Sequence, residues 1–208
     1  MALVSCHRPR PTHRYGNLSF KVGALPYAGL HGGEEQELTL QEFTDQIMSS
    51  SPGADRRVIF NPIPADHPMA KDVLMSGDGL GGPSEPLKYF NWAAIMNESS
   101  GGRTPIKRPG VFEFYFGPVL SGAHPHQHAS TWNALLRGKK RWFLWPAGCR
   151  NIGWRHGMPV WEWVKTELPQ LRGKGCSPLE FYQHANEVLF IPYGWHHAVL
   201  NVEPVIGK

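Results

Sequence analysis

"GAHPHQHASTWNALLRGKKRWFLWP", residues 122–146, places three histidines within five positions, ahead of two short apolar runs separated by a glycine. Such runs with a turn residue between them are typical of paired β-strands. Side chains two positions apart on a strand share a face, so His126 and His128 can reach one metal ion while Gln127 faces away. His124 has the same parity, which leaves a competing pair of His124 and His126 open.

A third metal ligand has to come from another part of the chain, and residues 186–201, "NEVLFIPYGWHHAVLN", supply two candidates. The Pro-Tyr-Gly turn there delivers His196 and His197 to the start of a new strand, and alternation turns one of the two inward. An H-x-H pair alone is weak evidence of a metal site, because most histidines serve other roles. The combination of the two segments is what favours a metal site.

Composition describes an ordinary folded chain with many turns. The 208 residues fit one domain, with 41% hydrophobic and 18% charged residues, and the 23 Gly, 19 Pro and 8 Trp indicate short strands. A net charge of +4 is too small to indicate a nucleic-acid site. The three cysteines form no C-x-x-C pair, which argues against a disulfide scaffold or thiolate zinc site and favours a reducing compartment. No apolar run approaches the roughly 20 residues that span a bilayer.

The order of elements indicates a helical lead-in followed by strands. Thr39 and Glu42 form a capping-box pattern that predicts a helix over residues 40–49. We expect a further short helix at 88–97 and one within 157–171, whose tryptophans either cover the strands or form a lid. Short strands separated by turns are predicted at residues 56–64, 110–118, 132–138, 140–146, 187–192 and 196–202.

Residues 121–146 followed by 186–201 resemble the JmjC domain, the cupin-like fold of iron- and 2-oxoglutarate-dependent oxygenases. The resemblance covers about residues 56–208 and rests on two separated motifs in the right order. It implies a mainly β fold whose core is a double-stranded β-helix, also called a jelly roll, with a few flanking helices. We therefore expect a basic, Gly/Pro-rich tail with little regular structure at 1–36 and a single JmjC/cupin-like domain at 37–208. That domain divides into a lead-in at 37–110 and a ligand-bearing barrel at 111–208.

The resemblance also implies the metal ligands. Most active members of the family have H-x-D on the first ligand strand and a distal histidine before a V-x-N strand. Matched from "GKKRW", the first ligand falls on His126, the aspartate position on His128 and the distal ligand on His197. The H-x-H pattern is similar to that of a JmjC subgroup, so we interpret the histidine as a property of that subgroup.

The co-substrate site of the family maps onto Asn133 and Lys140. A lysine ammonium suits this role because it can pair with the far carboxylate of 2-oxoglutarate while the keto acid end chelates the metal. Without the resemblance, Lys140 would be interpreted as one residue of a solvated basic cluster. The family's hydroxyl residue three positions before the first ligand is replaced by Ala123, for which Tyr115 could substitute.

Two functions stay open. The first is an Fe(II)- and 2-oxoglutarate-dependent oxygenase that hydroxylates or demethylates an unidentified protein or small molecule, with catalytic residues beyond the metal ligands unknown. The second is a non-catalytic JmjC-fold module that binds a metal or a partner, because three neutral imidazoles also suit zinc and the aspartate is missing. Partners are expected to include neither membrane nor nucleic acid. A homo-oligomer follows if the last strand is cut short, and the expected compartment is cytoplasm or nucleus, with an organelle as the alternative.

Overall fold

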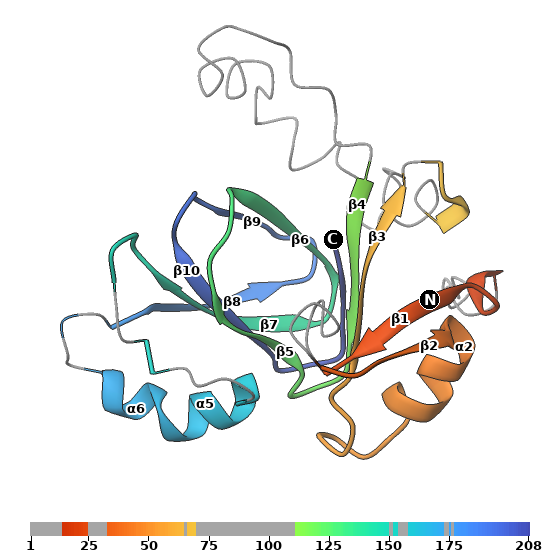
Figure 1. Cartoon of the computed structure of the whole chain (residues 1–208), viewed down its shortest axis with the longest axis horizontal. Coiled ribbons are helices and arrows are strands. Elements are labelled where there is room, and N and C mark those ends of the chain that lie inside the picture. The colour runs from red at the N-terminus through yellow and green to blue at the C-terminus, as the bar shows by residue number, and fades with distance from the viewer. Residues whose placement is uncertain are drawn as a thin grey trace, which may run out of the picture.

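Two antiparallel sheets form the framework of the protein in a computed structural model that describes residues 14–24, 33–64, 66–69, 111–149, 152–153, 158–172, 175 and 177–208 (Figure 1). The larger sheet has seven strands in the order β2 (Glu35–Thr39), β1 (Ser19–Gly23), β3 (Val58–Pro64), β4 (Val111–Gly117), β11 (Val205–Gly207), β6 (Thr131–Arg137) and β9 (Val188–Ile191). The smaller sheet has the order β5 (Gly122–His126), β10 (His196–Asn201), β7 (Lys139–Trp145) and β8 (Leu179–His184). This architecture confirms the predicted mainly β class.

The inner faces of the two sheets pack against each other through alternate residues of their strands. On β7, Trp142 and Leu144 point inward and join Ile191 of β9 and Val199 of β10 in one buried cluster. Phe143 and Trp145 alternate with them and face outward. The period of two seen in the sequence therefore decides which side chains enter the barrel.

Two short helices cover the outer face of the smaller sheet, in the region predicted to hold one helix. They are α5 (Val160–Thr166) and α6 (Leu168–Leu171), and Pro169 lies at the start of α6, where a missing N–H is tolerated. Trp163 of α5 is fully buried with its ring edge-on to Phe143 and Trp145. The structure thus favours the covering role of these tryptophans over a lid. The helix expected at 88–97 lies outside the described residues.

The capping box at Thr39 and Glu42 is confirmed, with the Thr39 hydroxyl accepting from the Glu42 amide and the Glu42 carboxylate accepting from the Thr39 amide. The helix is α2 (Leu40–Phe43), which continues as the π-helical turn η2 (Thr44–Met48). In Figure 1 these elements lie with β1 and β2 at the end of the molecule away from α5 and α6.

One expectation for residues 1–36 was wrong, because β1 falls inside this segment and pairs with both β2 and β3. Phe20 and Val22 of β1 are buried in the core beneath α2. Their alternation with Ser19 and Lys21 was the available signal, obscured by the glycines, prolines and arginines around it. The division of the chain at residue 36 stays a prediction.

No helix among the described residues is long and apolar enough to cross a membrane.

The turn between β6 and β7 depends on Gly138. Its φ of +86° lies in the left-handed region, and a Cβ there would stand 2.1 Å from the Pro204 carbonyl oxygen. We expect Gly138→Ala to lower the free energy of unfolding by about 2 kcal/mol or more. Gly148→Ala is the matched control, since Gly148 has a φ of +95° but nothing within 4 Å of its Cβ position. Urea unfolding that gives equal losses for both variants would contradict the clash.

Candidate metal centre

Three histidines converge at one end of the smaller sheet. His126 ends β5, His128 follows two residues later, and His197 on β10 is the cross-strand partner of His126. One ring nitrogen of each residue lies within 4.8 Å of the corresponding atoms of the other two. The structure thus brings together the three residues that the family resemblance had indicated.

The alternatives left open by spacing fall outside this group. The His124 ring is 5.8 Å from the His126 ring, centroid to centroid, but His124 does not join the three. A register irregularity between β5 and β10 shifts the strand at this point, which simple alternation does not anticipate. His196 points to the other face of β10 from His197, so it also lies outside the group.

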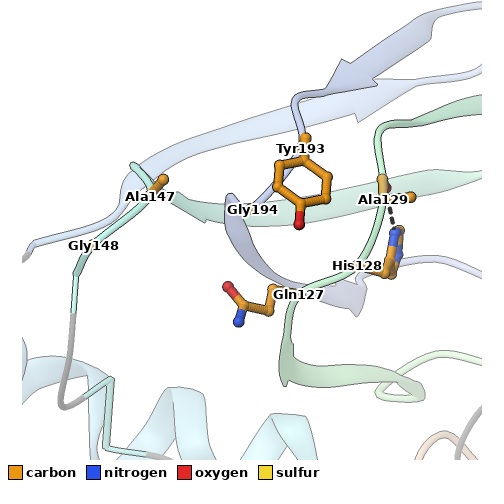
Figure 2. Close-up of a pocket in the computed structure, with 7 residues that line it drawn as sticks. All are labelled: Gln127, His128, Ala129, Ala147, Gly148, Tyr193 and Gly194. Atoms are coloured by element: carbon orange, nitrogen blue, oxygen red, sulfur yellow. Dashed lines mark hydrogen bonds between the residues drawn. The ribbon is translucent and has the colours of Figure 1, made fainter.

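Backbone carbonyls orient all three imidazoles in the same way. The Nδ1 atoms of His126, His128 and His197 lie 2.6, 2.7 and 3.1 Å from the carbonyl oxygens of His124, Ala129 and Trp195, and Figure 2 shows the contact at His128. A carbonyl oxygen only accepts, so each Nδ1 must carry the proton. The lone pair of each imidazole is therefore on Nε2, which is the tautomer that a metal site requires.

The electrostatics of His197 favour the neutral ligand form. Its side chain is 3% exposed, and burial is the main cause that lowers its pKa to about 3, with a further contribution from the neighbouring His126. A histidine that stays neutral at physiological pH needs to release no proton when it binds a metal.

Lys140 lies inside the barrel on β7, with 2% of its surface exposed. Its Nζ donates to the Asn133 Oδ1 at 3.1 Å and lies 4.6 Å from the centre of the Tyr115 ring. Burial lowers the pKa of Lys140 to about 7, and among the described residues no acidic partner offsets that burial. Lys139 points outward onto the Tyr182 ring at 4.4 Å, as strand alternation predicts.

Trp142 lies between the histidine cluster and the lysine. Its ring centroid is 6.2 Å from that of His197, and the Lys140 Nζ lies 5.6 Å from the Trp142 ring. The two candidate subsites, one for a metal and one for an anion, are therefore neighbours along the inner face of the smaller sheet.

A group of buried polar side chains lies beside Lys140, whose cross-strand partner on β10 is Asn201. The Asn201 amide donates to the Tyr115 hydroxyl at 2.8 Å and to Ser121 Oγ at 2.7 Å. Burial raises the Tyr115 pKa to about 12, so this phenol stays protonated. Ala123, at the position where the family resemblance implies a hydroxyl residue, packs in the apolar cluster with Trp142. Sequence analysis missed Ser121 and Asn201, although the parity of Asn201 with His197 was a usable signal.

An open pocket of about 470 Å³ lies beside His128. Figure 2 shows the Tyr193 ring between the Ala147–Gly148 turn and the segment that carries Gln127 and His128. The Gln127 side chain leaves the chain on the side away from the His128 imidazole, as the period of two predicted. No charged group lines this pocket among its described residues, which are Gln127, His128, Ala129, Ala147, Gly148, Tyr193 and Gly194.

Comparisons with known proteins agree with this arrangement. A family model described as "JmjC domain, hydroxylase" matches residues 155–207, which include His197. The chain is 35% identical over 105 residues to the 2-oxoglutarate and iron-dependent oxygenase JMJD4 of Danio rerio, covering 45% of this chain and 24% of that protein. It is 34% identical over 116 residues to the bifunctional arginine demethylase and lysyl-hydroxylase psr-1 of Caenorhabditis elegans, covering 49% of this chain and 29% of that protein.

A longer match extends over nearly the whole chain. JmjC domain-containing protein 8 of Homo sapiens is 24% identical over 205 residues, which are 95% of this chain and 66% of that protein. The match to each of the two proteins above spans less than a third of its length. The family model and these relatives show that the chain is similar to JmjC proteins, and the arrangement of its two sheets agrees with that similarity.

Proposed function

We propose that this chain carries the centre of an Fe(II)- and 2-oxoglutarate-dependent oxygenase. In this proposal His126, His128 and His197 hold the metal, while Lys140 and Asn133 hold the far carboxylate of the co-substrate. The observation that carries the proposal is the pairing of two features across Trp142: three convergent histidine nitrogens and a buried lysine without an acidic partner among the described residues.

The residues fit a divalent metal. Three imidazoles whose Nδ1 protons are committed to backbone carbonyls present three neutral nitrogen donors, which suit Fe(II) and also zinc. Because His128 stands where most relatives have an aspartate, the ligand set supplies no negative charge of its own. A dianionic co-substrate therefore meets a more positive centre than a 2-His-1-carboxylate set would provide. The assignment to an H-x-H subgroup remains a prediction.

The residues also fit a dicarboxylate. Burying a cation without a counter-ion is unfavourable, and the lowered pKa of Lys140 expresses that cost. A carboxylate beside Nζ would restore the protonated ammonium and form a charge-assisted hydrogen bond. The Asn133 oxygen accepts one of the three Nζ protons and leaves the other donors for the ligand.

When bound, iron and 2-oxoglutarate would supply the oxygen-activating chemistry of the site, and the chain would position the molecule that is oxidised. The relatives named above include an arginine demethylase and lysyl-hydroxylase. For this chain we propose hydroxylation or demethylation of a protein or a small molecule, which would approach the metal from the side of the barrel that bears His128.

A metal-binding module without oxygenase activity is the second candidate. The observation in its favour is the ligand set itself, which contains no carboxylate, together with the apolar surroundings of Ala123. An anionic donor helps to stabilise highly oxidised iron, so its loss lowers the expected rate of oxygen activation.

Oxygen-dependent succinate release distinguishes the two candidates. We expect the anaerobic protein with Fe(II) and 2-oxoglutarate to show a metal-to-ligand absorption band, and to release succinate slowly when oxygen and ascorbate are added. His128→Asp should raise that rate if the missing charge limits it and the shorter side chain still reaches the metal. If both proteins show the band but neither releases succinate, the binding module is the remaining candidate. If the band is absent, 2-oxoglutarate is not a ligand of this site.

A further inference from the structure

We propose that Gln183 is the positioning residue of the co-substrate site, holding Asn133 and Trp142 so that Lys140 keeps a fixed place relative to the histidine cluster. This inference rests on the function proposed above. Gln183 touches no metal ligand in the described structure and acts through its two neighbours.

Gln183 lies on β8 directly opposite Lys140 of β7, with 2% of its surface exposed. Cross-strand partners share a face of the sheet, so both side chains enter the barrel. A buried amide is unfavourable unless its hydrogen bonds are made, and here both ends of the amide are used.

Three hydrogen bonds determine the orientation of the Gln183 amide. Its Oε1 accepts from Trp142 Nε1 at 2.8 Å, and its Nε2 donates to the carbonyl oxygens of Asn133 and Glu187 at 2.9 and 3.0 Å. An indole N–H can only donate and a carbonyl can only accept, so a flipped amide would lose all three bonds.

These contacts span the interior of the barrel. Asn133 belongs to β6 of the larger sheet, whereas Trp142 and Gln183 belong to the smaller sheet. Gln183 thus joins the two sheets beside Lys140. Both residues that it holds also contact the lysine: the Asn133 side chain accepts from Nζ, and the Trp142 ring separates Nζ from His197.

The neutral charge of Gln183 is consistent with this role. A carboxylate directly opposite Lys140 would become its counter-ion and would compete with the carboxylate of a ligand. An amide of the same shape satisfies the surrounding main chain and leaves the lysine available.

Two probes separate positioning from general stability in the Mn(II)-loaded protein. 2-Oxoglutarate carries a far carboxylate, whereas 2-oxobutyrate has the same metal-chelating end and no second carboxylate. We expect Gln183→Met to weaken 2-oxoglutarate binding by about 10- to 30-fold in titration calorimetry, as for other residues that orient a ligand-contacting group. Binding of 2-oxobutyrate and of Mn(II) should change by less than about threefold.

Ile47→Ala provides the control for lost stability, because Ile47 is fully buried in a different core cluster. It should leave both probe affinities unchanged. If Gln183→Met does not fold, Gln183→Asn takes its place, since a side chain one methylene shorter cannot make all three bonds and should show the same selective loss.

Two results would overturn the inference while the proposed function stands: an equal loss for both probes, which would make Gln183 a brace of the fold, or an unchanged preference for 2-oxoglutarate. A wild-type protein that binds 2-oxoglutarate no better than 2-oxobutyrate would instead overturn the co-substrate site itself, and the role of Gln183 with it.

Discussion

Replacement of His197 by alanine is expected to lower the affinity for Fe(II) or Zn(II) by more than about 100-fold, beyond the range for residues that only orient a ligand. His197 is the most buried member of the cluster and is paired across the strands with His126. Its removal leaves the two nitrogens of His126 and His128, which come from one short segment. Elemental analysis after dialysis, followed by titration with metal, measures the loss.

The same experiment tests the register of the first strand. We expect His126→Ala and His128→Ala to lose the metal as His197→Ala does. His124→Ala and His196→Ala are the matched controls, because both are neighbouring histidines outside the group of three, and they should retain the metal. If His128→Ala retains the metal fully and His124→Ala loses it, the ligands from the first strand are His124 and His126 instead.

Lys140→Met is expected to change stability and ligand binding in opposite directions. In the unliganded protein it should raise the free energy of unfolding by on the order of 3 kcal/mol, because it removes a buried ammonium. Methionine is similar in size to lysine, so the substitution leaves no cavity. At the same time it should weaken 2-oxoglutarate binding by more than about 30-fold through loss of the ion pair. Urea unfolding and calorimetry measure the two effects.

The pH dependence of this stability difference has a defined sign. The folded pKa of Lys140 is about 7, below the value of roughly 10.4 for an unfolded lysine. Between these values the unfolded chain binds more protons, so the Lys140 contribution to wild-type stability rises with pH. The advantage of Lys140→Met is therefore complete below pH 7 and disappears towards pH 10.

Lys139→Met supplies the comparison, since Lys139 is the adjacent lysine and contacts Tyr182 on the outer face. It should alter stability by less than about 1 kcal/mol and leave 2-oxoglutarate binding unchanged. Equal small effects of the two substitutions would mean that Lys140 is only one residue of a solvated basic cluster, as the sequence without the family resemblance suggests.

Strand alternation predicted much of the candidate site. It indicated that Lys139 and Lys140 face opposite ways and that His126 and His128 share one face, while the family resemblance supplied the inward direction of Lys140. It could not choose between His124 and His128, because the choice depends on the irregular pairing of β5 with β10, and that pairing involves strands distant in the sequence.

The parts of the fold that sequence analysis missed depend on tertiary contacts. β1 is a strand because β2 and β3 flank it, although its neighbours in sequence favour turns. Gln183 is indistinguishable in sequence from any polar strand residue until β6 and β7 surround it. Asn201 could have been predicted, because it lies an even number of residues from His197 on the same strand. Strand alternation, the rule applied to the lysines, puts such residues on one face.

The position of β10 between β5 and β7 determines when a metal can be captured during synthesis of the chain. A nascent polypeptide that has released β5 and β7 from the ribosome still lacks His197, and β5 then has no partner within its sheet. Insertion of β10 joins the two strands and delivers the last nitrogen donor in one step. In the proposed metal site, loading is therefore expected to follow the pairing of β10 with β5 and β7, so the ion is selected after these strands have come together.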